Sequence, residues 1–292
     1  MNSMIIPGSA SKELAKLFSE NLGYPLANVE YTKFPNGEFK VGIKEDELPK
    51  TVYIVQSTYE PQGMHYFEAY FLSEQARDEF SVGEVIGIFP FMGFSREYSS
   101  IKRIFKQLKN SGINRAITFD AHFHREEGKC DDFDISCHTL TASKPLIDYA
   151  IERFSLENPF IISPDKGGKE IVSKYEDKYD ATFLIKERLS PDKVRIVRLA
   201  NEELDVEGRN IILNDDTMGT CDTMIEASEY LKSRGAERII ATATHAELVH
   251  IKDAYNSLAH EVSGIVVTDT IPNFLSDVVS VSNLIQRNKE FL

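Results

Sequence analysis

Short apolar runs alternate with amphipathic stretches along most of the chain. Consecutive apolar residues predict buried strands at 4–6, 52–55, 85–89 and 116–119, and again at 160–162, 182–185, 211–213, 238–243 and 264–267. Helix-like spacing of apolar residues lies between many of these runs, for example at 14–18, 101–108 and 224–231. This alternation predicts an α/β fold, with mainly parallel sheets flanked by helices.

The strands fall into two series, which predicts two domains. We place the first domain at 1–143 and the second at 144–276. The remaining residues, 277–292, have a helical pattern and are expected to pack back on the first domain. An acid-containing turn follows a strand in each series, although residue identity between the two series is too weak to indicate a duplication.

Composition narrows the class of protein. The chain has 292 residues, 42% of them hydrophobic, which is enough for a substantial core. A formal net charge of -13 argues against sequence-independent binding to nucleic acid. No apolar run approaches the ~18 residues of a membrane span, and the start lacks a signal-peptide pattern. Three cysteines without CxxC spacing indicate neither a disulfide framework nor a zinc site. We therefore expect a cytoplasmic protein that holds phosphorylated ligands through local cations or a metal.

The stretch 214–223 carries the strongest chemical signal. Asp215 and Asp216 follow a predicted buried strand, and a Gly/Thr turn then leads into a helix. Ligands of open α/β sheets bind where strands end, and the N–H groups of a helix N-terminus favour phosphate. The acids suit ribose hydroxyls or a metal-bound sugar. A capping box between Thr223 and Glu226 is the structural alternative, and spacing alone leaves both open.

Two other strand ends carry possible ligands. His122 follows the strand 116–119 and could bind a metal or phosphate, although a lone histidine is more often structural. Asp165 lies in the Pro-Asp-Lys-Gly-Gly turn after the strand 160–162. Its carboxylate could bind Mg²⁺, because hard cations prefer oxygen ligands. A plain turn with a surface acid is equally compatible with the pattern.

Cations and aromatics mark three further turns. Lys186 and Arg188 precede Ser-Pro and predict a mobile basic loop that could stabilise a transferring phosphoryl group, or else a solvated hairpin. Phe34 lies at a Pro-Asn-Gly turn, where it could stack on a base or simply pack. Arg96 follows a strand and a Phe-Pro-Phe segment, and is a possible phosphate contact.

The order of these motifs resembles the ribose-phosphate pyrophosphokinase (phosphoribosyl diphosphate synthase) family over nearly the whole chain. No single motif is decisive, but their shared order along one chain is highly specific. The Leu-Ser-Pro after Arg188 is similar to archaeal-type members. The segments that carry the resemblance are 34–38, 90–96, 120–122, 163–168, 186–188, 215–223, 244–245 and 268–272.

The resemblance implies two phosphoribosyltransferase-like domains, a Mg²⁺ cofactor, and ATP and ribose 5-phosphate as substrates. The C1 hydroxyl of the ribose would attack the β-phosphorus of ATP, giving phosphoribosyl diphosphate and AMP. By carry-over, the catalytic residues are Lys186 and Arg188, and the metal ligands are His122 and Asp165. The ATP-binding residues are Phe34, Asn36, Glu38 and Arg96, with Phe34 and Glu38 reaching adenine from a neighbouring subunit. The residues that bind ribose 5-phosphate are Asp215, Asp216, Gly219, Thr220 and Thr223. The family also implies a homo-oligomer, a dimer or higher.

Two segments depart from the family pattern. Gly219 stands where the family usually has Asp or Ser, and Asp222 stands where the family usually has Gly. Repulsion between the Asp222 carboxylate and an incoming phosphate would cost at most roughly 4 kcal/mol. The segment after Arg96 is shorter and less polar than in the family. We therefore expect an active synthase, with reduced activity possible. The alternative is a catalytically impaired paralogue that serves as a binding or regulatory subunit. A nucleobase phosphoribosyltransferase is less favoured, because the chain has two full series of strands and the Lys186/Arg188 segment.

Overall fold

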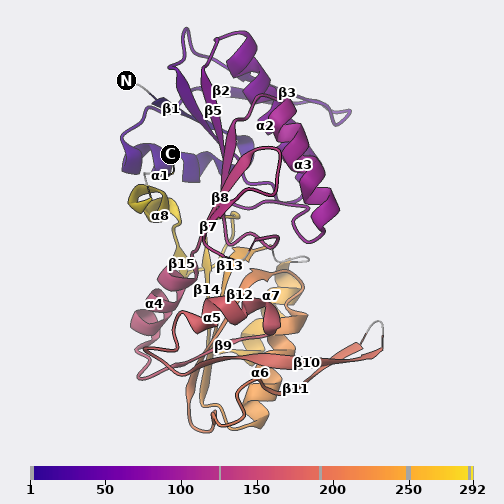
Figure 1. Ribbon diagram of the computed structural model, residues 1–292, viewed down its shortest axis with the longest axis vertical. Coiled ribbons are helices and arrows are strands. Elements are labelled where there is room, and N and C mark those ends of the chain that lie inside the picture. The colour runs from indigo at the N-terminus through magenta and orange to yellow at the C-terminus, as the bar shows by residue number, and fades with distance from the viewer. Residues whose placement is uncertain (1–2, 125, 191–192, 248–250, 289–290, 292) are drawn as a thin grey trace. The chain divides into compact units, whose positions relative to one another are not determined.

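The computed structural model describes residues 3–124, 126–190, 193–247, 251–288 and 291. The chain divides into two compact units (Figure 1). Unit 1 comprises Met1–Thr141, Asp269–Pro272 and Ser280–Leu292, and unit 2 comprises Ala142–Thr268 and Asn273–Val279. Each unit is built around its own sheet. The mixed architecture confirms the predicted α/β fold.

Unit 1 contains a six-stranded sheet in the order β1-β4-β5-β6-β8-β7. The first five strands in that order are parallel, and β7 is antiparallel at the edge. Their central residues are apolar and buried, as expected for strands covered on both faces. The bounds are β1 (Ser3–Pro7), β4 (Thr51–Val55), β5 (Glu84–Phe89), β6 (Arg115–Phe119), β7 (Gly128–Cys130) and β8 (Ser136–Leu140).

Helices cover this sheet and bury its aromatic core. Phe18, Phe89 and Phe105 are fully buried within unit 1. Helix α1 ends at Gly23, whose positive φ of 70° gives the left-handed cap that glycine favours. The helical elements are η1 (Ser9–Ser11), α1 (Lys12–Leu22), α2 (Gln62–Asp78), α3 (Tyr98–Asn110) and α8 (Ser282–Arg287), which packs against α1. A separate antiparallel hairpin pairs β2 (Val29–Lys33) with β3 (Phe39–Ile43).

Unit 2 contains a seven-stranded sheet in the order β11-β10-β9-β12-β13-β14-β15. All neighbours are parallel except β10 and β11, which form an antiparallel hairpin. Figure 1 shows this hairpin projecting beyond the body of unit 2. The bounds are β9 (Phe160–Ser163), β10 (Ala181–Ser190), β11 (Lys193–Leu199), β12 (Asn210–Met218), β13 (Arg238–Ala246), β14 (Gly264–Thr268) and β15 (Val278–Val279).

The helices of unit 2 connect these strands. Helix α4 packs on β12, β13 and β14, whereas α6 packs on β11 and β12 and against α7. The bounds are α4 (Ser143–Phe154), η2 (Lys166–Gly168), α5 (Lys169–Ser173), α6 (Asp222–Ser233) and α7 (Ile251–Glu261). None of the helices in the described ranges is both long and apolar enough to cross a bilayer.

Three expectations need correction. Strand β10 continues to Ser190, where a loop was one of the two alternatives, because β11 pairs with it along that length. Strand β12 continues to Met218, well beyond the predicted run 211–213, because it pairs with β13 through Met218 and Ala246. The tail was predicted to be helical throughout, but it first contributes strand β15, and its α-helix among the described residues is Ser282–Arg287. The domain boundary at 143/144 stays a prediction, since compactness does not establish independent folding.

Candidate active site

Polar side chains gather at the carboxyl end of the sheet in unit 2. Asp165 follows β9 and caps η2, where its Oδ1 accepts a hydrogen bond from the N–H of Gly167 at 2.7 Å. The hydroxyl of Ser163 donates to the backbone oxygen of Asp165 at 3.1 Å. A Cβ at position 168 would lie 2.0 Å from Ser163 Oγ, so this turn requires Gly168. The short helix η2 that Asp165 caps packs against β9, β10 and β12.

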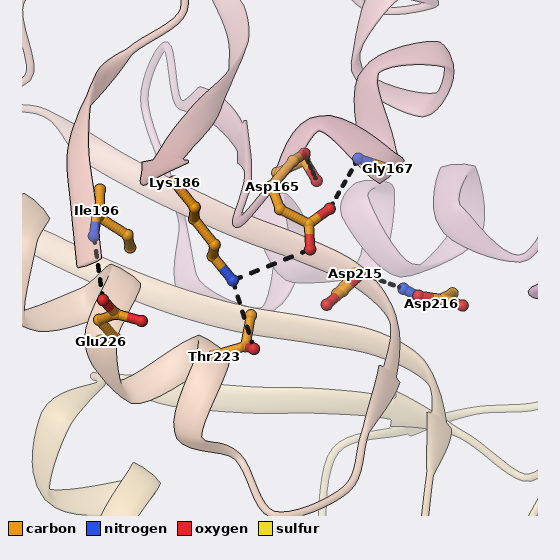
Figure 2. A network of polar contacts seen from close by, with 9 residues as sticks. Asp165, Gly167, Lys186, Ile196, Asp215, Asp216, Thr223 and Glu226 are labelled. Atoms are coloured by element: carbon orange, nitrogen blue, oxygen red, sulfur yellow. Dashed lines mark hydrogen bonds and ion pairs between the residues drawn. The ribbon is translucent and has the colours of Figure 1, made fainter. Parts of the chain in front are cut away.

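Lys186 reaches into this group of residues from β10. Its Nζ lies 3.9 Å from Asp165 Oδ2 and donates to Thr223 Oγ1 at 3.4 Å (Figure 2). The Lys186 side chain is 19% exposed. Arg188 lies two residues further along β10, opposite Val194. The side chain of Arg188 falls outside the described part of the chain. Of the two alternatives for this segment, the structure has a hairpin and not a loop, and the assignment of Lys186 and Arg188 as catalytic residues stays a prediction.

Asp215 and Asp216 lie within β12 and are buried. The N–H of Asp216 donates to Asp215 Oδ1 at 2.9 Å. Burial raises the pKa of the Asp215 carboxyl well above its usual range, and the negative charges of Asp216 and Asp165 add to that rise. A carboxyl in this environment gains from a bound hydroxyl or cation, because either one replaces the water that burial removes.

A strand–turn–helix follows the two acids. Gly219 and Thr220 form the bend after β12, and Cys221 then takes a left-handed conformation, with φ 66°, at the N-cap of α6. Within the described residues, the Cys221 side chain makes no capping hydrogen bond to the helix. Asp222 is the first residue of α6 and is exposed, and Thr223 follows in the same turn. The Thr223 hydroxyl therefore joins the first turn of α6 to the Lys186 ammonium.

The predicted capping box between Thr223 and Glu226 is wrong. Helix α6 begins at Asp222 with Cys221 as its N-cap, two residues earlier than a box with Thr223 as N-cap requires. Thr223 Oγ1 accepts from Lys186 instead, and Glu226 Oε1 accepts from the backbone N–H of Ile196 at 3.0 Å. The Glu226–Ile196 contact joins segments 30 residues apart, so no local sequence pattern could have revealed it.

In unit 1, Arg96 lies at the end of a tightly built turn after β5. The N–H of Gly93 donates to Thr58 Oγ1 at 2.8 Å, and the Tyr66 hydroxyl donates to the Gly93 oxygen at 2.9 Å. A Cβ at position 93 would lie 2.5 Å from the backbone oxygen of Thr58, so only glycine fits. Phe94 is left-handed, with φ 61°, and its ring is 48% exposed. Arg96 is also exposed.

The segment after Arg96 enters α3 directly through Glu97. The Glu97 carboxylate accepts hydrogen bonds from the N–H groups of Ser99 at 3.1 Å and Ser100 at 2.6 Å. Side-chain hydrogen bonds from Ser99 and Ser100, together with these two backbone bonds, lower the pKa of Glu97 to about 2. The acid that departs from the family pattern is therefore an N-cap, the position where such side chains satisfy the first amides of a helix.

The other predicted residues of unit 1 lie in two different places. His122 is half-buried in the turn after β6, close to Asp120, whose φ is 34°. Phe34, Asn36 and Glu38 lie at the exposed tip of the β2–β3 hairpin, which is a separate sheet.

The hairpin tip has a defined turn. The N–H of Phe34 donates to the Glu38 oxygen at 2.8 Å, and the N–H of Glu38 donates to Asn36 Oδ1 at 3.1 Å. Gly37 has φ 91°, which explains a glycine there. The Phe34 ring is 43% exposed. Across the described ranges, no group of three or more His, Cys, Asp or Glu side chains forms a metal site.

Together these features define a class: a two-unit α/β protein whose polar groups lie where parallel strands end, the usual ligand site of open α/β sheets. Residues 3–109 match the model of the N-terminal domain of ribose phosphate pyrophosphokinase, and residues 196–284 match the phosphoribosyl synthetase-associated domain. The chain is 32% identical to a ribose-phosphate pyrophosphokinase of Haemophilus ducreyi, over 97% of this chain and 90% of that protein.

Further comparisons agree. A ribose-phosphate pyrophosphokinase of Methanopyrus kandleri is 34% identical over 92% of this chain and 93% of its own. The crystal structure of phosphoribosylpyrophosphate synthetase from Mycobacterium smegmatis matches with a TM-score of 0.83 at 25% identity, covering 99% of this chain and 98% of that one. This chain belongs to the ribose-phosphate pyrophosphokinase family.

Proposed function

We propose that this protein is a ribose-phosphate diphosphokinase. It transfers the diphosphate of ATP to the C1 hydroxyl of ribose 5-phosphate, producing phosphoribosyl diphosphate and AMP. The observation that carries the proposal is the position of the Lys186 ammonium, 3.9 Å from Asp165 and 3.4 Å from Thr223, beside the strand–turn–helix that ends β12. Family membership supplies the reaction, and this arrangement supplies a charged site suited to it.

Ribose 5-phosphate is expected to bind at the end of β12. The backbone N–H groups between Gly219 and Thr223 suit its phosphate, because a helix N-terminus attracts anions. The carboxyl groups of Asp215 and Asp216 suit the ribose hydroxyls, with which buried acids can form hydrogen bonds. The exposed carboxylate of Asp222 opposes the phosphate, although water around it weakens that repulsion.

The transferring diphosphate gains charge on its oxygens in the transition state. Catalysis of this kind rests mainly on positioning and on fixed positive charge. Lys186 supplies that charge in our proposal, and Arg188, two residues along the same strand, supplies more.

We assign ATP binding to residues of unit 1. The exposed ring of Phe34 offers a stacking face for adenine, and Asn36 and Glu38 offer polar groups beside it. Arg96 offers a guanidinium to the phosphates. In the family pattern the hairpin residues act on a neighbouring subunit, so this assignment goes with a homo-oligomer. We further propose a cytoplasmic location and the two domains at 1–143 and 144–276.

Mg²⁺ is the cofactor that this reaction implies. The ion prefers oxygen ligands and keeps several of its waters. Asp165 fits, since its Oδ2 lies 3.9 Å from Lys186 Nζ, beyond hydrogen-bond distance, and can accept a metal-bound water. His122 fits less well, because imidazole is not the preferred donor for Mg²⁺. When bound, the ion would neutralise charge on the ATP phosphates.

A turnover assay tests the proposal. Purified, assembled protein is incubated with ATP, Mg²⁺ and ribose 5-phosphate, and AMP is separated by chromatography while phosphoribosyl diphosphate is followed by ³¹P NMR. We expect equimolar AMP and phosphoribosyl diphosphate, with neither formed when ribose 5-phosphate is omitted or Mg²⁺ is chelated. Absence of both products across several pentose phosphates would overturn the proposed function.

A further inference from the structure

The β10–β11 hairpin contains an irregularity opposite Lys186. Ile185 pairs with Arg198, but the next residue, Lys186, pairs with Ile196. Strand β11 therefore has one residue more than β10 at this point, which makes a β-bulge. A bulge bends its strand and changes the direction of nearby side chains, and bulges are common beside active sites. The direction of the Lys186 side chain thus depends on this bulge being held in one register.

Glu226 binds the backbone at the bulge. Its Oε1 accepts from the N–H of Ile196 at 3.0 Å (Figure 2). Ile196 is 4% exposed and belongs to the hydrophobic core of unit 2, which also includes Met224, a residue of the same helix as Glu226. The Glu226–Ile196 hydrogen bond is therefore partly shielded from water. A hydrogen bond to a carboxylate is stronger than one to a neutral group, and it would resist slippage of the strand.

The same helix also holds the end of the Lys186 side chain. Thr223 and Glu226 are three residues apart on α6 and therefore share one face of the helix. Thr223 accepts from the Lys186 ammonium, while Glu226 accepts from the residue paired with Lys186 in the hairpin. The lysine is thus fixed at its tip and, through the strand pairing, at its backbone by two residues of one helical turn.

We propose that Glu226 is a positioning residue for Lys186. It does not act on the substrate; it holds the bulge in the register that directs the ammonium toward Asp165 and Thr223. The catalytic consequence rests on the proposed function, in which Lys186 stabilises the transferring group. The positioning itself is a property of the folded chain and is measurable without turnover.

Three variants test this positioning. Glu226→Ala removes the acceptor, Glu226→Gln keeps an acceptor oxygen at the same length, and Glu229→Ala is the control, an exposed acid on the same helix. We expect Glu226→Ala to raise exchange of the Ile196 amide and the rate at which an amine reagent modifies Lys186, each roughly tenfold, as loss of one charge-assisted hydrogen bond predicts. Glu226→Gln should restore most of both values, and Glu229→Ala should leave them unchanged.

Kinetics provide the second readout. Glu226→Ala should lower kcat roughly tenfold while KM for both substrates stays within about twofold, because the lysine acts mainly in the transition state. Glu226→Gln should recover most of kcat. If Glu226→Ala does not fold, Glu226→Met replaces it, since methionine fills similar volume without an acceptor.

The two proposals fail in different ways. A wild-type protein without turnover, in which Glu226→Ala still raises Lys186 modification, overturns the proposed function and supports the positioning. A folded Glu226→Ala or Glu226→Met variant with wild-type Ile196 exchange and Lys186 modification overturns the positioning. So does a Glu226→Gln variant that is as impaired as Glu226→Ala.

Discussion

Replacement of Lys186 by methionine should abolish most turnover and leave the fold nearly unchanged. The two effects differ because the lysine faces the Asp165 carboxylate in the free protein and the charge of the diphosphate during the reaction. In the free protein its partner is Asp165 at 3.9 Å, and the Asp165 side chain is 40% exposed. Water screens such a pair, so its loss should cost less than about 1 kcal/mol of unfolding free energy.

During the reaction the same ammonium would face the charge developing on the diphosphate. Lys186 is only 19% exposed, so an effective dielectric of about 20 is more appropriate there. At a separation of about 4 Å, a unit charge pair is then worth roughly 4 kcal/mol, or roughly a thousandfold in kcat. Substrate binding adds little to this difference, so KM should change far less than kcat.

The assay compares Lys186→Met with Lys174→Met, which removes an exposed lysine from the same unit. Steady-state AMP release gives kcat and KM, and thermal unfolding gives stability. We expect a 10²- to 10³-fold loss of kcat for Lys186→Met, in the range seen when one oxyanion-stabilising donor is removed. The control should behave as wild type. A folded Lys186→Met protein that keeps kcat within about threefold of wild type would refute the reasoning.

Three other predictions follow from the turns and caps. The pKa of Glu97, about 2, lies below its usual value, so the stabilisation of the fold by the Glu97 cap is present above pH 4.5 and is lost toward pH 2. The difference in thermal midpoint between wild type and Glu97→Ala should therefore vanish over that range. A difference that stays constant with pH would contradict the cap. Gly168→Ala should lower the free energy of unfolding in urea by roughly 1–3 kcal/mol, and by less in a Ser163→Gly background, because the new Cβ clashes with the Ser163 side chain. Equal losses in both backgrounds would exclude that clash as the cause. Asp222→Gly should tighten ribose 5-phosphate binding roughly fivefold by calorimetry, since exposure leaves about 1 kcal/mol of repulsion; unchanged or weaker binding counts against it.

Sequence patterns predicted the α/β fold because its strands are short, apolar and buried. The runs 52–55, 85–89 and 160–162 coincide with strands in which nearly every residue is buried. The polar extensions of strands escaped prediction. Asn214, Asp215 and Asp216 continue β12 because its neighbour β13 supplies hydrogen bonds along that length. Polarity suggested a turn there, whereas ladder pairing decides where a strand ends.

The candidate site shows the same division. Asp165 and the turn after β12 could be proposed from the sequence because turn residues and acids at strand ends have local signatures, and their roles stay predictions. The role of Glu226 could not be found, because its partner Ile196 lies on another element and local spacing suggested a cap with Thr223 instead. The Glu226–Ile196 contact depends on the register of β11 against β10, which shifts by one residue between Ile185 and Lys186 at a bulge that the hydrophobic pattern did not reveal.

The discontinuity of unit 1 has a consequence for how the chain is made. Val281 and Ile285 are buried in unit 1, α8 packs on α1, and the N–H of Val281 donates to Asp269 Oδ1 at 2.9 Å. The ribosome synthesises these residues only after the strands of unit 2. Until unit 2 has been translated, the nascent unit 1 therefore lacks α8, and the surface of α1 that α8 covers stays exposed. A fragment cut at 141 would carry that uncovered surface permanently, so separate expression of unit 1 needs residues 269–272 and 280–292 joined to it.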